Sequence, residues 1–238
     1  MITLDELCKE LGIVEGSAEE YEELLSTWEL WAGRKCEPGS VFLEGLEESV
    51  SYAEQARLFD GSAIRVSRVI APAVARAMWD SKTVLEVGFG TALRLCYYAR
   101  NFPQTYFTGI DKNLIAVEFA RERVRTLSLD NVDIIHQNML DIDPNKNTYD
   151  AVVNVQITGQ DTPSEEILRI QSQVRRLVSL KPGSRLVALE PKIEDLTWKR
   201  RLIAAVKEDG FSKVRGEEVA FEHYRNEPWE CVVRTYTR

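Results

Sequence analysis

The sequence predicts an α/β protein built in three layers around a doubly wound, mostly parallel sheet of seven strands, with a C-terminal antiparallel hairpin and an N-terminal helical extension. Three observations support this fold class. From residue 83 onward short β-rich runs alternate with helical segments, a turn with two glycines follows the first run, and a turn signal separates the last two runs. Alternating strands and helices are typical of parallel sheets covered by helices on both faces.

Residues 1–80 carry helical rather than strand patterns, because their apolar side chains recur at helical spacing. A helix is expected from Ile64 to Trp79, and Pro72 should kink it or restart it, since proline lacks the N–H group that a helix interior uses. We therefore expect a helical cap over residues 1–80 and a separate domain over residues 81–238.

From residue 83 the order of elements is strand, helix, strand, helix. The expected parallel strands are Thr83–Val87, Tyr106–Ile110, Val132–His136, Ala151–Val155 and Arg185–Glu190. The expected helices between them are Ala92–Arg100, Leu114–Leu127 and Glu165–Leu180. A helix near residues 196–208 comes next, and the last two strands are expected at Lys213–Phe221 and Trp229–Thr237. The turn between these two strands holds Asn226 and Pro228, which predicts an antiparallel hairpin.

The strongest functional signal is the turn after the first predicted strand. A buried strand ends in glycines and a helix follows in the run VLEVGFGTA, residues 84–92. Glycine lets the backbone approach a ligand without a Cβ clash, and the helix N-terminus offers unpaired N–H groups. Leu93 replaces the third glycine of the dinucleotide motif GxGxxG, which disfavours an NAD-dependent oxidoreductase. The next strand ends near Asp111, whose carboxylate can accept hydrogen bonds from both hydroxyls of a ribose.

The run from Val84 to Pro191 resembles the class I, Rossmann-like family of S-adenosylmethionine (SAM)-dependent methyltransferases, with the family's motifs in order. The segment from Glu86 to Gly90 resembles the loop that wraps the methionine part of SAM. Ala92 stands where the family has the last glycine of this loop. The resemblance therefore implies SAM as the cofactor.

Further motifs of the family follow along the chain. Asp111 matches the acid that binds the ribose, and Asn138-Met139 matches the pair that reads the adenine, with an amide in place of the usual aspartate. The fourth-strand motif is matched by Tyr149–Asn154 and the turn before the fifth strand by Lys181–Arg185. The cofactor-binding residues expected from the resemblance are Glu86, Gly88, Phe89, Gly90, Asp111, Lys112, Asn138, Met139 and Asn154. Two of them keep a second interpretation, Glu86 as a buried structural carboxylate and Phe89 as a filler of the loop.

The candidate residues on the acceptor side are Trp28, Trp31, Tyr52, Gln156, Glu190 and His223. The aromatic residues among them fit a pocket beneath a lid, although aromatics at helical spacing are more often plain core. His223 has the ordinary pKa of a general base, about 6.5, but an exposed turn explains it better. No catalytic residue is assigned.

Composition narrows the class of protein. A net charge of −8 disfavours nucleic acid as the acceptor, and a motif of the NPPY type, which serves the methylation of base amines, is absent. Four cysteines without CxxC spacing and two histidines predict free thiols and no metal site. Apolar runs fall short of the ~20 residues of a bilayer span, and Met1–Glu6 lacks the basic start of a signal peptide. We expect a cytoplasmic protein that binds neither nucleic acid nor a membrane, and a homodimer is left open.

The leading hypothesis is a SAM-dependent methyltransferase that acts on an oxygen or nitrogen of a small molecule, such as a specialised metabolite. Because the sulfonium is already activated, the enzyme mainly has to align the two reactants, and it needs a base only for a protonated acceptor. The alternatives are transfer of the aminocarboxypropyl group and a non-catalytic SAM-binding subunit of a complex. If the N-terminal helices form a lid, deletion of residues 1–60 should abolish transfer and preserve SAM binding.

Overall fold

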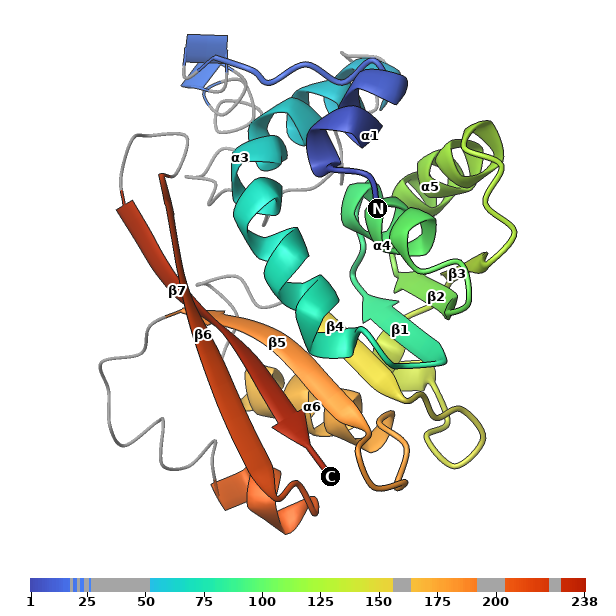
Figure 1. Ribbon diagram of the computed structural model, residues 1–238, viewed down its shortest axis with the longest axis vertical. Helices are drawn as coiled ribbons and strands as arrows, with labels where there is room; N and C mark the ends of the chain where they lie inside the picture. The colour runs from blue at the N-terminus through green and yellow to red at the C-terminus, as the bar shows by residue number, and fades with distance from the viewer. Residues whose placement is uncertain are drawn as a thin grey trace.

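The computed structural model describes residues 1–17, 19–20, 22–23, 26, 52–155, 164–191, 204–222 and 228–238. Figure 1 shows how its elements are arranged. The helices are α1 (Leu4–Glu10), α3 (Tyr52–Met78), α4 (Leu93–Asn101), α5 (Leu114–Thr126), the short 3₁₀ helix η2 (Met139–Asp141) and α6 (Ser164–Arg176). The strands are β1 (Thr83–Val87), β2 (Tyr106–Asp111), β3 (Val132–His136), β4 (Ala151–Val155), β5 (Arg185–Pro191), β6 (Lys213–Glu222) and β7 (Pro228–Thr237).

The seven strands form one sheet in the order β3-β2-β1-β4-β5-β7-β6. Strands β1 to β5 pair in parallel, and β7 inserts antiparallel between β5 and β6. The expected fold class, including the C-terminal hairpin, is therefore confirmed. The strand order reverses between β1 and β4, and an open α/β sheet binds ligands at the carboxyl end of the strands beside such a reversal.

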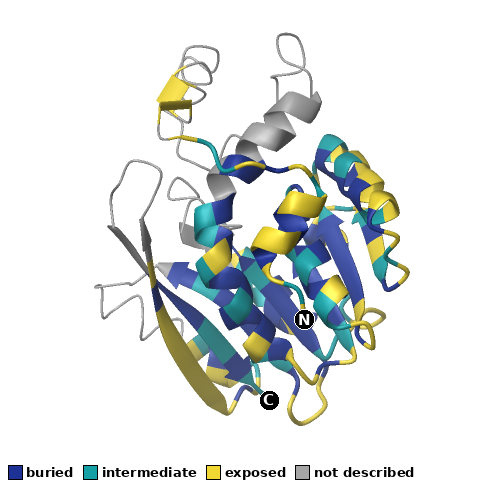
Figure 2. Cartoon of the chain, turned by 45° about the horizontal axis from the view of Figure 1, so that its top comes forward, coloured by how far each residue is buried: buried dark blue, intermediate teal, exposed yellow. Residues whose placement is uncertain are grey.

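Side chains alternate between two apolar cores, one on each face of the sheet. Val84 of β1 belongs to the core beneath α1, α3, α4 and α5, whereas its neighbour Leu85 belongs to the core beneath α6. Figure 1 shows α3 and α4 on the near side of the sheet and α6 on the far side. Figure 2 shows the central strands almost wholly buried, while the outer strand β6 is largely exposed.

Helix α3 is one continuous helix that passes through Pro72. The expected helix start at Ile64 and the expected restart at Pro72 are therefore wrong. Proline removes one hydrogen bond from the helix ladder, but Ala71 and Ala73 on either side of it are fully buried against the sheet layer. Burial of this face offsets the local cost, because tertiary packing contributes more to helix stability than intrinsic propensity does.

Residues 1–17, here called the N-terminal segment, pack across α3. A capping box of Thr3 and Glu6 begins α1, and Leu7 of this helix is completely buried in the core. Arg68 of α3 forms ion pairs with both Asp5 and Glu15 of the segment. Helix α3 also contacts β5, β6 and β7. The division of the chain at residue 80 stays a proposal.

Replacement of Gly61 by alanine is expected to destabilise the fold by about 1–3 kcal/mol, as overpacking does. A Cβ atom at this position of α3 would lie 2.6 Å from the carbonyl oxygen of Val14, a backbone atom that a side-chain rotation cannot move. Helix propensity alone would favour alanine by about 1 kcal/mol. Urea denaturation measures the result, and Gly16→Ala is the matched control, because its Cβ would meet only Glu20 Oε2 at 3.6 Å. Equal stability of the two variants would contradict this close contact.

None of the described helices is both long enough and apolar enough to cross a membrane.

Candidate functional site

The turn after β1 has a backbone that favours glycine at three positions. Gly88, Gly90 and Ala92 have φ angles of 68°, 58° and 57°, in the left-handed region that glycine enters at no steric cost. Gly88 N donates to the carbonyl of Ile110 at 2.8 Å, which fastens the turn to β2. A Cβ built on Gly90 would meet no atom within 4 Å. The glycine loop, residues 88–92, therefore leaves open space beside Gly90, from which a ligand could approach the backbone.

The carboxylate of Asp111 joins the end of β2 to the glycine loop. Its Oδ2 accepts a hydrogen bond from Gly90 N at 3.1 Å, and its Oδ1 accepts one from Asn113 N at 3.0 Å. A carboxylate has about four acceptor positions, so these bonds leave it able to accept from a ligand hydroxyl. Burial raises the pKa of Asp111, while backbone hydrogen bonds from Asn113, Gly90 and Lys112 and the charge of Lys112 oppose that rise. The two features that sequence reasoning paired lie in direct contact.

Glu86, which is buried, and Arg94, which is partly exposed, form a loose ion pair and stand on either side of the glycine loop in the sequence. Arg94 Nε lies 3.7 Å from Glu86 Oε1, which exceeds hydrogen-bonding distance. Within the described part of the chain, Arg94 Nε and Glu86 Oε2 are buried without a hydrogen-bond partner. Burial raises the pKa of Glu86 to about 7, and the charge of Arg94 opposes the rise. Among the described residues, the charge of Glu86 also raises the pKa of Cys96 and of Tyr98 of α4.

This carboxylate gives the fold a pH dependence of known sign. Because the pKa of Glu86 is raised in the folded state, its contribution to stability is present below about pH 4.5 and is lost as the pH rises to about 7. At 1.36 kcal/mol for each pKa unit, the loss is on the order of 3 kcal/mol. Glu86→Gln should lose less stability than the wild type across this range, measured by urea denaturation at stepped pH. Parallel curves for the two proteins would refute the assignment.

A buried network of Asp60, Thr91 and Arg123, which sequence reasoning missed, anchors the glycine loop to α3 and α5. Asp60 of α3 is completely buried and bonds to the hydroxyl of Thr91 and to the guanidinium of Arg123 of α5. Arg123 also donates to the carbonyl of Thr91 at 2.6 Å. Thr91 is thus held through its side chain and its backbone. The only sequence signal was one acid in an apolar helical run, which did not reveal its partners.

Deletion of residues 1–60 would remove Asp60 as well as any lid. The deletion would therefore disturb the glycine loop, and loss of SAM binding would follow whether or not a lid exists.

The loop after β3 contains the residues expected to read the adenine. Asn138 is exposed and its side chain accepts from Leu140 N at 3.0 Å, which caps η2, and Met139 is buried. Gln173 of α6 donates to the carbonyls of Met139 and Ile142, at 3.2 and 2.6 Å. The α6 helix therefore fixes this loop at the same edge of the sheet as the glycine loop.

The remaining candidates lie at different places. Lys112 is exposed next to Asp111, and its carbonyl contacts His136 Nε2 at 2.9 Å. Asn154 of β4 pairs in register with Val87. Phe89 is buried in the core beneath α4, which favours its interpretation as a filler of the loop.

Glu190 of β5 accepts from the Tyr236 hydroxyl at 2.6 Å and forms an ion pair with Arg234, and both partners lie on β7. A role of Glu190 on the acceptor side stays a prediction. Trp28, Trp31, Gln156, His223 and the side chain of Tyr52 lie outside the described residues.

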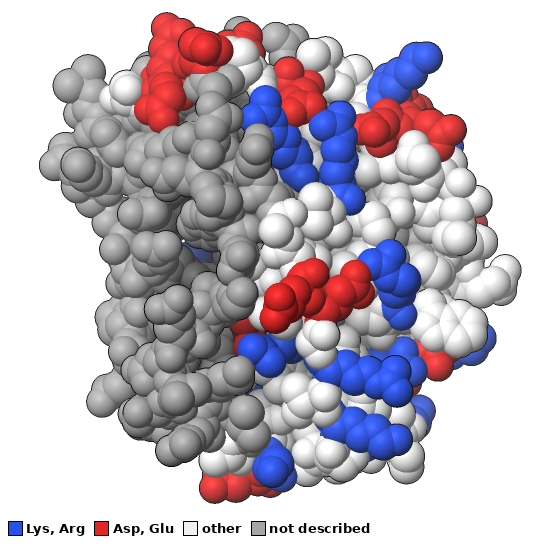
Figure 3. Space-filling model, turned by 60° about the vertical axis from the view of Figure 1, so that its left-hand side comes forward, with Lys and Arg blue, Asp and Glu red and all other residues white. Residues whose placement is uncertain are grey.

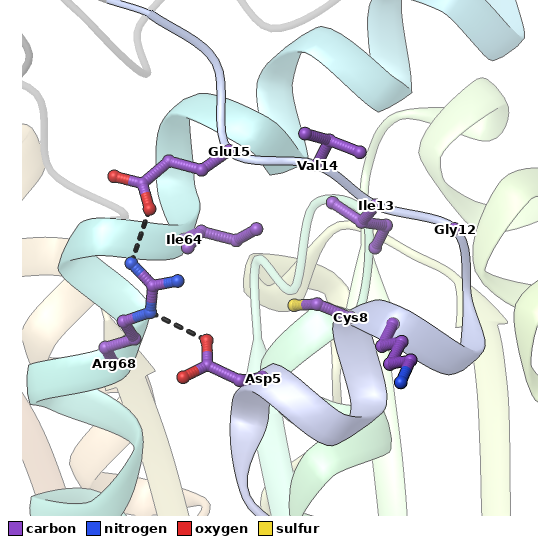
Figure 4. Close-up of a pocket in the computed structure, with 9 residues that line it drawn as sticks. Asp5, Cys8, Gly12, Ile13, Val14, Glu15, Ile64 and Arg68 are labelled. Atoms are coloured by element: carbon purple, nitrogen blue, oxygen red, sulfur yellow. Dashed lines mark hydrogen bonds and ion pairs between the residues drawn. The ribbon is translucent and has the colours of Figure 1, made fainter.

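A cavity of about 390 Å³ lies between the N-terminal segment and α3. Figure 4 shows Arg68 between Asp5 and Glu15 at one wall and Cys8 at another. Burial raises the pKa of Cys8 to about 11, so its thiol stays protonated and unreactive at neutral pH. The described residues contain no cluster of three or more side chains suited to holding a metal ion.

Comparison with known proteins agrees with this geometry. Residues 84–183 match a family described as "Methyltransferase domain". The chain is 32% identical over 133 residues to a fatty-acid O-methyltransferase of Mycolicibacterium smegmatis, which covers 55% of this chain and 46% of that protein. It is 29% identical over 77 residues to (S)-tetrahydroprotoberberine N-methyltransferase of Eschscholzia californica. This match covers 32% of this chain and 22% of that protein. The chain thus spans less than half the length of the curated relatives it matches.

Solved structures share the fold. An O-methyltransferase family protein from Burkholderia thailandensis superposes with a TM-score of 0.62 at 16% identity, over 92% of this chain and 70% of that one. A magnesium protoporphyrin IX methyltransferase from Synechocystis, solved with bound SAM, gives 0.56 at 16% identity, over 84% and 88%. The family match assigns a methyltransferase domain to residues 84–183. The solved structures show that the chain shares the fold of SAM-dependent methyltransferases. The resemblance that its motifs indicated is confirmed.

Proposed function

We propose that this protein binds SAM at the glycine loop and transfers its methyl group to an oxygen or nitrogen of a small molecule. The observation that supports it most is the Asp111 carboxylate, which is fixed by Gly90 N and Asn113 N beside the glycine loop and can still accept from a ribose. The open space beside Gly90 and the unsatisfied oxygen of Glu86 fit the methionine end of the same ligand. The residues present therefore suit SAM.

In this proposal the residues of the chain bind SAM and orient it toward the acceptor. When bound, SAM supplies a methyl group on an activated sulfonium. Asp111 would hold the ribose, the loop after β3 would contact the adenine, and the glycine loop would let the methionine end approach the backbone. Alignment of two reactants in one site supplies much of the acceleration of such a displacement. A general base is required only for an acceptor that arrives protonated.

Two observations support a small-molecule acceptor. The relatives named above are a fatty-acid O-methyltransferase and a (S)-tetrahydroprotoberberine N-methyltransferase, and both names specify a small-molecule acceptor. The net charge of −8 opposes a polyanionic acceptor. On the face drawn in Figure 3, basic and acidic side chains of the described residues lie interspersed, so this face offers no purely cationic track.

The test begins with calorimetry of SAM and S-adenosylhomocysteine (SAH), followed by incubation of labelled SAM with a panel of fatty acids, phenols and amines. Product mass separates methyl transfer from aminocarboxypropyl transfer. Binding in the micromolar range and a methylated product would support the proposal. Binding of neither compound would refute it, and binding without any product across the panel would favour a non-catalytic subunit.

A further inference from the structure

The pair Glu86–Arg94 is incomplete as an ion pair. Buried charges are normally satisfied by several hydrogen bonds, because each one left unmade costs free energy. Here the closest N–O separation is 3.7 Å, and each partner keeps one buried polar atom unsatisfied among the described residues. The side chains are 13% and 2% exposed. A pair built only for stability would be expected to close to hydrogen-bonding distance.

The surrounding charges do not satisfy Arg94. The charge of Arg94 lowers the pKa of Asp60, so the two groups interact. However, both oxygens of Asp60 already bond to Arg123 and Thr91. Arg94 also lies in the first turn of α4, a helix with no acidic residue in that turn. The N-terminal end of a helix favours anions over cations. Arg94 therefore stands where an anion would be doubly stabilised, by its guanidinium and by the helix end.

The position of the pair indicates what would occupy it. Glu86 comes just before the glycine loop and Arg94 just after it, so the two charges flank the loop proposed to hold the methionine end of SAM. That end is a zwitterion, with an ammonium and a carboxylate on the same carbon. A zwitterion placed between a carboxylate and a guanidinium replaces one poor ion pair with two charge-assisted pairs.

We propose that Arg94 binds the carboxylate of the amino-acid end of SAM, and that the Glu86–Arg94 pair opens to admit this zwitterion with its ammonium on Glu86. This inference rests on the proposed function and adds Arg94 as a residue that determines cofactor specificity. Arginine suits the role because its planar fork matches a carboxylate with two parallel hydrogen bonds.

Three probes that share the adenosine part separate the contributions. SAH carries both charged groups, its decarboxylated analogue carries only the ammonium, and 5′-methylthioadenosine carries neither. Calorimetry with Arg94→Met should show SAH affinity reduced about 10- to 100-fold, as expected for hydrogen bonds between charged groups. The affinity for 5′-methylthioadenosine should change less than about twofold.

Arg94→Lys keeps the positive charge beside Glu86 but loses the planar fork of the guanidinium. It should weaken SAH about tenfold and leave the decarboxylated analogue unchanged.

Arg125→Met is the matched control, because Arg125 lies exposed on α5 in an ion pair with Glu122. It should bind all three probes as the wild type does. Equal weakening of all three probes in Arg94→Met would overturn the proposal in favour of a role in loop structure. Unchanged SAH affinity would overturn it in favour of a pair completed by water. Failure of the wild type to bind any probe would instead contradict the proposed function itself.

Discussion

Replacement of Asp60 by alanine is expected to lower the free energy of unfolding by about 3–5 kcal/mol, the cost of leaving one partner of a buried ion pair uncompensated. Arg123 would keep its charge in a site where its side chain is 5% exposed. Thr91 would lose the acceptor of its hydroxyl, so the glycine loop would lose one of its two attachments to the network. Urea denaturation followed by circular dichroism measures the stability.

Asp5→Ala is the control for this measurement. Asp5 of α1 also forms an ion pair with an arginine, Arg68 of α3, but its side chain is 62% exposed. An exposed pair contributes about 0–1 kcal/mol, so this variant should unfold close to the wild type. Equal effects of the two substitutions would show that the Asp60 pair is no stronger than a surface pair.

The double variant Asp60→Leu/Arg123→Met separates stability from positioning of the loop. Apolar replacement of both members of a buried pair is often neutral or stabilising, so stability should return toward that of the wild type. Affinity for SAH, measured by calorimetry, should stay at least about tenfold weaker, because the hydrogen bonds that hold Thr91 are not restored. Recovery of both properties together would contradict a positioning role for the network.

Replacement of Asp111 by alanine is expected to have the largest effect on cofactor binding. Two charge-assisted hydrogen bonds to a ribose, at about 1.5–3 kcal/mol each, correspond to a loss of at least about 100-fold in affinity for SAH. The glycine loop would also lose its bond from Gly90 N to the carboxylate. Asp111→Asn keeps the shape and one acceptor oxygen, so an intermediate affinity is expected.

Asp133→Ala, on an exposed position of the neighbouring strand β3, controls for the loss of an acid near the site. Its SAH affinity should stay within about twofold of the wild type. The pKa of Asp111 is raised by burial, so wild-type affinity should decline as the pH falls and this carboxylate takes up a proton. An affinity in Asp111→Ala equal to that of the control would rule out the acid as the ribose ligand.

Much of the α/β part could be predicted from the sequence, because its strands have local signals. The strands β1, β3 and β4 have the expected bounds to the residue, since each is a short β-rich run flanked by polar or helical segments. The contact between Asp111 and the glycine loop could also be predicted, because adjacent parallel strands end at the same edge of a sheet. Such features depend on residues close in sequence or on strand order.

Features that join distant elements could not be predicted in the same way. Helix α3 runs through Pro72 because burial of its neighbours outweighs the cost of the hydrogen bond that proline removes. The sequence pattern does not show that the residues on both sides of Pro72 are buried. The network of Asp60, Thr91 and Arg123 joins three elements through side chains. The sequence does not single out Arg94 as a site residue, because an arginine on an amphipathic helix is ordinarily solvated. Its position beside the buried Glu86 follows only from the packing of α4.

The most direct test of the central claim is a crystal structure of the protein with SAH. The account predicts that both ribose hydroxyls lie within hydrogen-bonding distance of the Asp111 carboxylate, with the amino-acid end against the glycine loop, residues 88–92. Occupancy of the cavity beside Arg68 instead, or a ribose turned away from Asp111, would contradict it.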